Sequence, residues 1–287
     1  MPGPNIFVGI ESALTIRPHL ERMTASELNT ILTSGMATIA SSVLAFYTFI
    51  LQNQFPTIAG HLVSASILSA PAALVMSKIL LPESNTPDTL GVHVKPEYSK
   101  ENNVIEAVIN GANAGVKLVV GVVALLLAFL GMVALLDLIL GGVGNWINQL
   151  LGLKIEWTLK GFLGYLFYPF TLIIGIPSAD AFEISKIIGE RLIVTEATAY
   201  QDLAVLISNQ VLQHPRSIII CTYALCGFAH VASLAIFVGG ISALVPKRTK
   251  DLSVLGPRAL LAATLACLMT AAVAGTFYNQ SSILLGQ

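Results

Sequence analysis

The stretch CTYALCGFAHVASLAIFVGG, residues 221–240, decides the fold class, because it is long enough to cross a bilayer and contains no Asp, Glu, Lys or Arg. A spanning helix needs about 20 mostly apolar residues. His230 nevertheless lies near the middle of the stretch. A polar side chain is costly in a membrane segment unless it meets a cavity, a partner or a substrate. The stretch therefore predicts a membrane helix with a polar side chain of functional interest.

The composition extends this prediction to the whole chain. Of the 287 residues, 55% are hydrophobic and 11% are charged, and the mean hydropathy is +0.78. Residues 28–77, 161–179 and 259–287 contain no charged side chain. We therefore expect an all-α integral membrane protein with several passes.

Charge and cysteine spacing exclude other classes. The net charge of -1 and the absence of a basic patch argue against nucleic-acid binding. The three cysteines lie in apolar runs without metal-ligand spacing, so we interpret them as small buried hydrophobic residues. The N-terminus lacks the pattern of a secretory signal, so insertion is expected to use the internal helices.

The alternation of apolar and polar segments predicts four regions along the chain. They are a partial first re-entrant hairpin with two membrane helices (1–83), a hydrophilic cytoplasmic connection (84–103), a membrane helix with an interfacial helix (104–153), and a second re-entrant hairpin with the last two membrane helices (154–287).

Local signals predict where the elements of these regions begin and end. Thr24 and Glu27 have the spacing of a capping box and precede one expected helix over residues 28–51. A later helix over 117–140 is expected to stop at the glycines of 141–144, before an amphipathic interfacial piece. The remaining expected elements are a helix over 61–77, a broken, charged segment over 161–196, and spans over 217–244 and 252–278.

Charged loops predict the orientation of the helices. Lys247, Arg248 and Lys250 form the densest basic run, which the positive-inside rule places on the inner face. The last helix then runs outward, so the C-terminus is expected on the extracellular or periplasmic side. Two sets of elements, each a broken segment followed by two spans, enter from opposite faces. This is the inverted-repeat pattern of secondary transporters.

Two carboxylates and a histidine are the candidate polar groups of the membrane region. Glu11 and Glu196 belong to the broken segments. A carboxylate there faces a cavity or substrate or, alternatively, reaches interfacial water at the end of a hairpin. His230 shares a helix face with Ser233. A histidine satisfied by its neighbours and a ligand-binding histidine both remain compatible with that position.

Motifs along nearly the whole chain agree with one family. They are GPNIFVGIES (3–12), IRPHL (16–20), ATIA (37–40), HLVSASILSAP (61–71), GIP (175–177), TEATAY (195–200), TYALCGFA (222–229) and LGPRAL (255–260). Together they resemble the concentrative nucleoside transporter family. The resemblance implies an inverted-repeat symporter, with two re-entrant hairpins and broken helices, that imports nucleosides or related ribosides across the plasma (inner) membrane.

The resemblance also implies a substrate site built from Glu11, Glu196, Phe228, His230 and Ser233. Glu11 keeps the acidic residue of the family's first hairpin tip, but the Gln and Thr that accompany it in the family are absent. Glu196 matches the family's ribose-binding Glu. His230 stands where the family has an Asn that contacts the sugar. Imidazole can also hydrogen-bond hydroxyl groups, although it is larger and titratable.

Ion coupling and assembly are implied in the same way. Asn5, Val8, Thr38 and the carbonyl of Ile39 match the family's Na⁺ site at a helix break, and hard oxygen ligands suit Na⁺ there. One hydroxyl-bearing position of the family is Ala37 here, so H⁺ coupling is the alternative. No other cofactor is expected. The resemblance further implies a homotrimer and, since family members have membrane helices before the first motif, an N-terminal partner polypeptide.

Three other hypotheses compete with transport by this chain. It could be a transport-incompetent fragment, a partner subunit of a split nucleoside transporter, or a homologue with a different substrate. An intramembrane enzyme would need a nucleophile, a base and an orienting group. His230 and Ser233 alone are a weak basis for one, so no enzymatic activity is expected.

Overall fold

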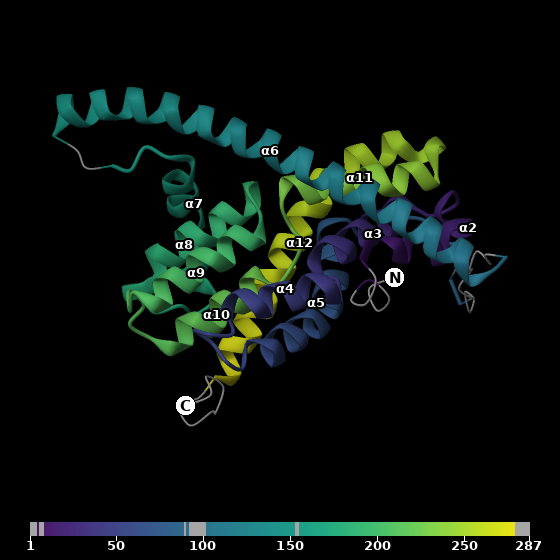
Figure 1. Ribbon diagram of the computed structural model, residues 1–287, viewed down its shortest axis with the longest axis horizontal. Coiled ribbons are helices and arrows are strands. Elements are labelled where there is room, and N and C mark those ends of the chain that lie inside the picture. Colours follow the sequence, from purple (N-terminus) through teal and green to yellow (C-terminus); the bar gives the residue numbers. More distant parts are fainter. Residues whose placement is uncertain (1–4, 6–8, 89, 92–101, 153–154, 279–287) are drawn as a thin grey trace.

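The computed structural model describes residues 5, 9–88, 90–91, 102–152 and 155–278, and every regular element within them is helical (Figure 1). The elements are η1 (Gly9–Ile16), α2 (Arg17–Leu20), α3 (Ala25–Ala37), α4 (Ser41–Leu51), α5 (Ile58–Leu80), α6 (Val104–Leu151), α7 (Leu159–Ile173), α8 (Ser178–Ile193), α9 (Glu196–Ser208), α10 (Pro215–Leu225), α11 (Val231–Leu244), η2 (Pro246–Arg248) and α12 (Thr249–Phe277).

Helix α12 is the central element and packs against α3, α5, α10 and α11. Small residues on its surface make this possible. Ala259, Ala263 and Ala266 are fully buried, and a Cβ at Gly256 would lie 2.7 Å from Leu234 Cδ1 of α11. Small side chains allow close backbone approach, which is how helices associate in lipid. The yellow helix in Figure 1 accordingly crosses the middle of the molecule.

The first expected membrane helix is broken. The capping box is confirmed, because the Thr24 hydroxyl accepts from Glu27 N and the Glu27 carboxylate accepts from Thr24 N. The expectation of one helix over 28–51 is wrong: α3 ends at Ala37, Thr38 is extended, and α4 begins at Ser41. Hydropathy cannot detect this break, because both halves are apolar. The expected span over 217–244 is likewise divided into α10 and α11 by residues 226–230.

Helix α6 is 48 residues long and runs along one side of the molecule from α11 toward α7 (Figure 1). The expected stop at the glycines of 141–144 is therefore wrong, and residues 146–151 continue α6 and do not form a separate interfacial helix. A glycine costs about 1 kcal/mol relative to alanine in a helix interior, which weakens a helix but does not end it. The helix ends instead at Gly152, whose φ of 65° is the left-handed cap conformation.

The segment expected to be broken between residues 161 and 196 contains most of α7, all of α8 and the first residue of α9. Helices α7 and α8 pack closely, since a Cβ at Gly189 would lie 2.9 Å from the backbone of Leu163. Residues 194 and 195 then form a tight connection to α9, where the Thr195 hydroxyl accepts from Thr198 N and caps the helix. Helices α8 and α9 contact each other and lie beside α10.

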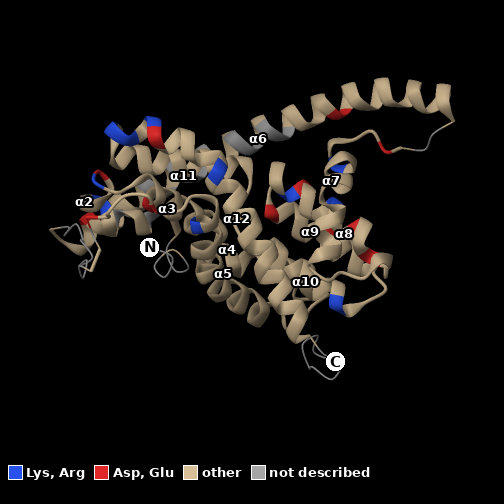
Figure 2. Ribbon diagram, turned by 180° about the vertical axis from the view of Figure 1, so that it is seen from behind, with Lys and Arg blue, Asp and Glu red and all other residues tan. Residues whose placement is uncertain are grey.

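Four stretches of the described chain are long and apolar enough to cross a membrane. They are Ala25–Leu51, which contains the first break, Ile58–Leu80, Gly131–Leu151 and Pro246–Phe277. Figure 2 shows charged residues gathered around α2 and the start of α12 at one end, and around α7 to α9 at the other. The expected multi-pass membrane protein is confirmed.

Candidate functional site

The two helix breaks lie against each other in the middle of the fold. A Cβ on Gly227, in the second break, would lie 3.1 Å from the carbonyl oxygen of Ala37, at the end of α3. The same atom would lie 2.4 Å from the Cys267 sulfur of α12. Only glycine fits this approach. The segment that follows α10 therefore meets the end of α3.

Glu196 is buried beside the second break. It is the first residue of α9, only 2% of its surface is exposed, and the Tyr47 hydroxyl of α4 donates a hydrogen bond to its Oε1. A carboxylate is favoured at a helix N-terminus, because the backbone N–H groups there carry partial positive charge. The side chain is thereby held as an acceptor in a site with little water.

His230 faces the other oxygen of Glu196. Its Nε2 lies 3.0 Å from Glu196 Oε2, and neither atom has a hydrogen bond of good geometry to a described residue. The other ring nitrogen, Nδ1, accepts from Ser233 N at 3.2 Å. We therefore assign the proton of the neutral ring to Nε2. A buried donor and a buried acceptor stand side by side, which suits a ligand hydroxyl that can both accept and donate.

Two further predicted residues surround this histidine. Ser233 is buried, and its hydroxyl accepts from His230 N and donates to His230 O, so it fixes the start of α11. The Phe228 ring meets the imidazole edge-on, with centroids 4.7 Å apart. Phe228 is only partly buried and presents an apolar surface next to the polar pair.

Three of the predicted ion ligands, Asn5, Thr38 and Ile39, lie at the first break. Asn5 Nδ2 donates to Gly35 O at 3.2 Å and to Thr38 Oγ1 at 2.6 Å. Ser12 donates to Asn5 Oδ1 at 3.4 Å. Ile39 is buried in the same break. Val8 and the side chain of Glu11 lie outside the described residues. The break thus gathers neutral oxygens at the negative end of α3, where the Asn5 amide joins them.

Tyr47 was missed by sequence reasoning, although its hydroxyl contacts Glu196 directly. The two residues are 149 positions apart, and Tyr47 belongs to an apolar stretch that predicts only a membrane helix. A tyrosine among phenylalanines was the one available signal, because a buried hydroxyl needs a partner. The Tyr47 ring also packs on Tyr200 of α9, with centroids 4.8 Å apart.

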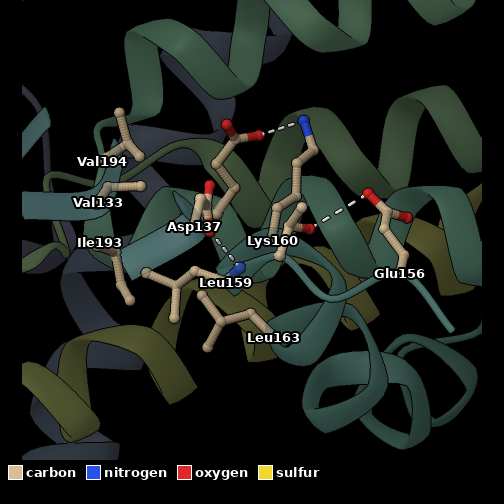
Figure 3. Close-up of a pocket in the computed structure, with 10 residues that line it drawn as sticks. Val133, Asp137, Glu156, Leu159, Lys160, Leu163, Ile193 and Val194 are labelled. Atoms are coloured by element: carbon tan, nitrogen blue, oxygen red, sulfur yellow. Dashed lines mark hydrogen bonds and ion pairs between the residues drawn. The ribbon is translucent and has the colours of Figure 1, made fainter. Parts of the chain in front are cut away.

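A pocket of about 170 Å³ lies beside the α8–α9 connection, between α6 and α7 (Figure 3). Each of its charged groups has a partner nearby. Lys160 bridges Glu190 of α8 and Asp202 of α9, and Asp137 of α6 accepts from the backbone N–H of Leu159. These contacts attach α7 to α6, α8 and α9, so we assign the pocket a structural role.

Comparisons with known proteins agree with this geometry. Residues 61–275 match the family model described as "Na+ dependent nucleoside transporter C-terminus". The chain is 39% identical to "Solute carrier family 28 member 3" of Eptatretus stoutii, over 96% of this chain and 41% of that protein. It is 34% identical to "Sodium/nucleoside cotransporter 1" of Oryctolagus cuniculus, over 96% of this chain and 42% of the relative.

A bacterial relative and solved structures extend the likeness. The "Uncharacterized transporter YutK" of Bacillus subtilis is 38% identical over 95% of this chain and 65% of its own length. The structure titled "CNTnw in an inward-facing substrate-bound state" has a TM-score of 0.81 at 36% identity, covering 96% of this chain and 63% of that one. A CNTnw variant in an outward-facing state has the same TM-score and identity.

This chain matches only part of the length of each relative. The chain spans about two fifths of the two vertebrate relatives and just under two thirds of the bacterial one. These relatives are transporters or cotransporters and not enzymes. Three quarters of this chain lie within the matched family region, from helix α5 to the end of α12. The chain therefore belongs to the family of Na⁺-dependent, concentrative nucleoside transporters.

Proposed function

We propose that this chain forms the transport region of an ion-coupled symporter that imports nucleosides or related ribosides. Two kinds of observation support the proposal. Relatives of the chain are named sodium/nucleoside cotransporters, and structures with the same fold are titled as inward-facing and outward-facing states. The chain itself has a buried polar pair beside the second helix break, where a solute could bind away from lipid.

The pair of Glu196 and His230 carries the proposal. A ribose hydroxyl lying beside the pair, within hydrogen-bond distance of both atoms, would donate to Glu196 Oε2 and accept from His230 Nε2. A base or other ring would lie against Phe228. Glu11 would supply the second carboxylate from the first hairpin. Ser233 would act through His230, because its hydroxyl is already used in fixing that residue.

The proposed transport movement uses re-entrant hairpins arranged as an inverted repeat. Helices α8 and α9 have 16 and 13 residues, which is too short for a crossing of about 20. Their connection at residues 194–195 lies next to the substrate pair. The partial first hairpin, with η1, would approach the first break in the same way. Movement of the hairpin-bearing part would then expose the pair alternately to the two sides.

For the coupling ion we propose Na⁺ at Asn5, Thr38 and the carbonyl of Ile39, with Val8 as a further ligand. The clustered neutral oxygens at the end of α3 support this choice. H⁺ coupling is the alternative. We also propose the plasma (inner) membrane as the location, an outer C-terminus, a homotrimer, and additional N-terminal membrane helices from a partner polypeptide or a longer chain.

Uptake into proteoliposomes tests the proposal. Purified protein with a cooperative melting transition would be reconstituted, and uptake of radiolabelled uridine and adenosine measured under separate Na⁺ and pH gradients. Gradient-driven uptake that Glu196→Gln abolishes is the expected result. His230→Asn should retain transport, because Asn can cap α11 and hydrogen-bond a hydroxyl. Riboside binding without uptake would indicate a binding or partner subunit. The absence of both binding and uptake would contradict the proposal.

A further inference from the structure

Arg191, on the last turn of α8, is the largest fully buried side chain among the described residues. Its Nη1 donates to the Ala224 carbonyl at 2.8 Å, whereas Nε and Nη2 have no hydrogen-bond partner in the described part of the chain. No described carboxylate forms an ion pair with it. A buried charge without a carboxylate is costly and needs another source of compensation.

The end of α10 supplies that compensation. Ala224 is the next-to-last residue of α10, which ends at Leu225 where the second break begins. The last carbonyls of a helix have no partner within the helix, and together they form the negative end of its dipole. The guanidinium caps one of these carbonyls. A positive charge therefore sits at the point where the broken helix is most negative.

The first break has a different arrangement at the equivalent place. Helix α3 ends at Ala37, and the carbonyl of Gly35 in its last turn accepts from the neutral amide of Asn5. The end of α3 thus has polar oxygens but no side chain with a positive charge among the described residues. The proposed coupling ion would supply that charge. The two breaks adjoin at Gly227 and Ala37.

We propose that the Arg191 guanidinium is the fixed cation of the second helix break, holding there the positive charge that the first break obtains from a bound monovalent ion. This inference rests on the proposed ion-coupled function. It assigns a single exchangeable cation to the pair of breaks. It also gives α8 a positioning role: Arg191 holds the end of α10, and five residues later Glu196 meets His230 across the same break.

Three substitutions separate charge from volume at this position. Arg191→Ala removes the charge and leaves space for a small cation. Arg191→Met removes the charge but fills most of the space. Arg191→Lys keeps the charge. Arg22→Ala, at an exposed arginine between α2 and α3, is the matched control.

The measurement is equilibrium binding of uridine to the purified full chain at increasing Na⁺ concentration. We expect binding by the wild type and Arg22→Ala to depend on Na⁺ to first order. Uridine affinity of Arg191→Ala should fall about 10- to 30-fold at low Na⁺, which corresponds to loss of a favourable charge–dipole contact. Uridine binding by Arg191→Ala should depend on Na⁺ concentration to second order, because a second ion would replace the lost charge. Methylguanidinium should restore the uridine affinity of this variant. Arg191→Met should lose affinity without rescue, and Arg191→Lys should retain most of it.

Two results would overturn the inference. One is an Arg191→Met protein that binds uridine with the affinity and Na⁺ dependence of the wild type. The other is an Arg191→Ala protein that methylguanidinium does not restore. If the wild type itself binds no uridine, the proposed function fails. The role of Arg191 as a fixed cation is then tested separately by thermal melting. A melting temperature that methylguanidinium raises in Arg191→Ala but not in Arg191→Met supports the fixed cation, and equal responses refute it.

Discussion

Glu196 is held from two sides by residues that are far from it in the sequence. The Tyr47 hydroxyl binds one oxygen and the His230 ring faces the other. A carboxylate that is 2% exposed would be costly without such neighbours, because burial removes its hydration. Tyr47 therefore acts as a positioning residue that sets the direction in which Glu196 presents its second oxygen.

Tyr47→Phe tests this positioning. The substitution leaves the ring and its packing on Tyr200 in place but removes a hydrogen bond to a charged group, which is worth about 1.5–3 kcal/mol. We expect a lower melting temperature and weaker uridine binding. Tyr200→Phe is the control, because the Tyr200 hydroxyl donates to the neutral Thr222 carbonyl and should cost only about 1 kcal/mol. Equal losses of uridine affinity in both variants would contradict the role given to Tyr47.

At the scale of elements, the two breaks depend on a close backbone approach. Gly227 lies against the Ala37 carbonyl and the Cys267 sulfur, so any side chain there must push the broken helices apart. Such overpacking costs about 1–3 kcal/mol. The breaks therefore need glycine for space, whereas most glycines of the long helix α6 face open space and need no such explanation.

Gly227→Ala should destabilise the protein by about 1–3 kcal/mol and weaken riboside binding, because Glu196 and His230 flank the displaced segment. Thermal melting and uridine binding would measure the two effects. Gly239→Ala in α11 is the control: no atom lies within 4 Å of its added Cβ, so alanine should be neutral or stabilising by up to about 1 kcal/mol. A Gly227→Ala protein as stable as the wild type would show that the breaks do not touch.

The start of α8 is attached to the start of α10 by a second buried carboxylate, outside the four spans. Asp180 accepts from the backbone N–H groups of Gln213 and His214 and from the Ser217 hydroxyl at 2.6 Å. Burial alone would raise the pKa of Asp180, but the hydrogen bonds from Gln213, Ser217 and His214 outweigh it and hold the pKa below its ordinary value of 3.8. The ionised form is thus the one that stabilises this connection.

This carboxylate predicts a pH dependence of stability. Because the pKa of Asp180 is lower in the folded state, its contribution is complete above the unfolded value near 3.8 and is lost as the pH falls through the folded value. Asp180→Asn should lower stability at neutral pH by about 1.5–3 kcal/mol. When melting temperatures are measured from pH 7 to pH 3, the difference in melting temperature between the wild type and Asp180→Asn should become smaller at acid pH. A constant gap would contradict this account.

For the molecule as a whole, the first and last thirds of the chain are tied together at one end. Arg248 of η2 donates from Nη1 to the carbonyls of Glu21 and Met23, each at 2.8 Å. Lys247, the residue before Arg248, pairs with the Glu21 carboxylate, and this contact lowers the pKa of Glu21. The loop before α3 and the loop before α12 therefore form a single surface beside the central helix.

Arg248→Ala should loosen this junction. Loss of the charged donor to two carbonyls is expected to cost about 1.5–3 kcal/mol and to speed proteolysis of the loop between α2 and α3. Lys247→Ala is the control and should have little effect, because its ion pair is 81% and 53% exposed and is screened by solvent. The two variants would be compared by thermal melting and limited proteolysis. Equal cleavage rates would show that the Arg248 contacts do not hold the loop.

The amino-acid sequence by itself determined the membrane environment, the apolar segments, the capping box at Thr24 and Glu27, and the identities of Glu196 and His230 as candidate groups. These are properties of local composition and motif, which need no knowledge of distant contacts. The tertiary structure alone decided where the first and last long segments break, that α6 continues through its glycines, and which groups face one another. Tyr47, Glu196 and His230 meet, and Arg191 reaches Ala224, because packing brings together helices that are distant in the sequence. In lipid a buried polar group must find its partner within the protein, and only the folded arrangement of helices determines which partner that is.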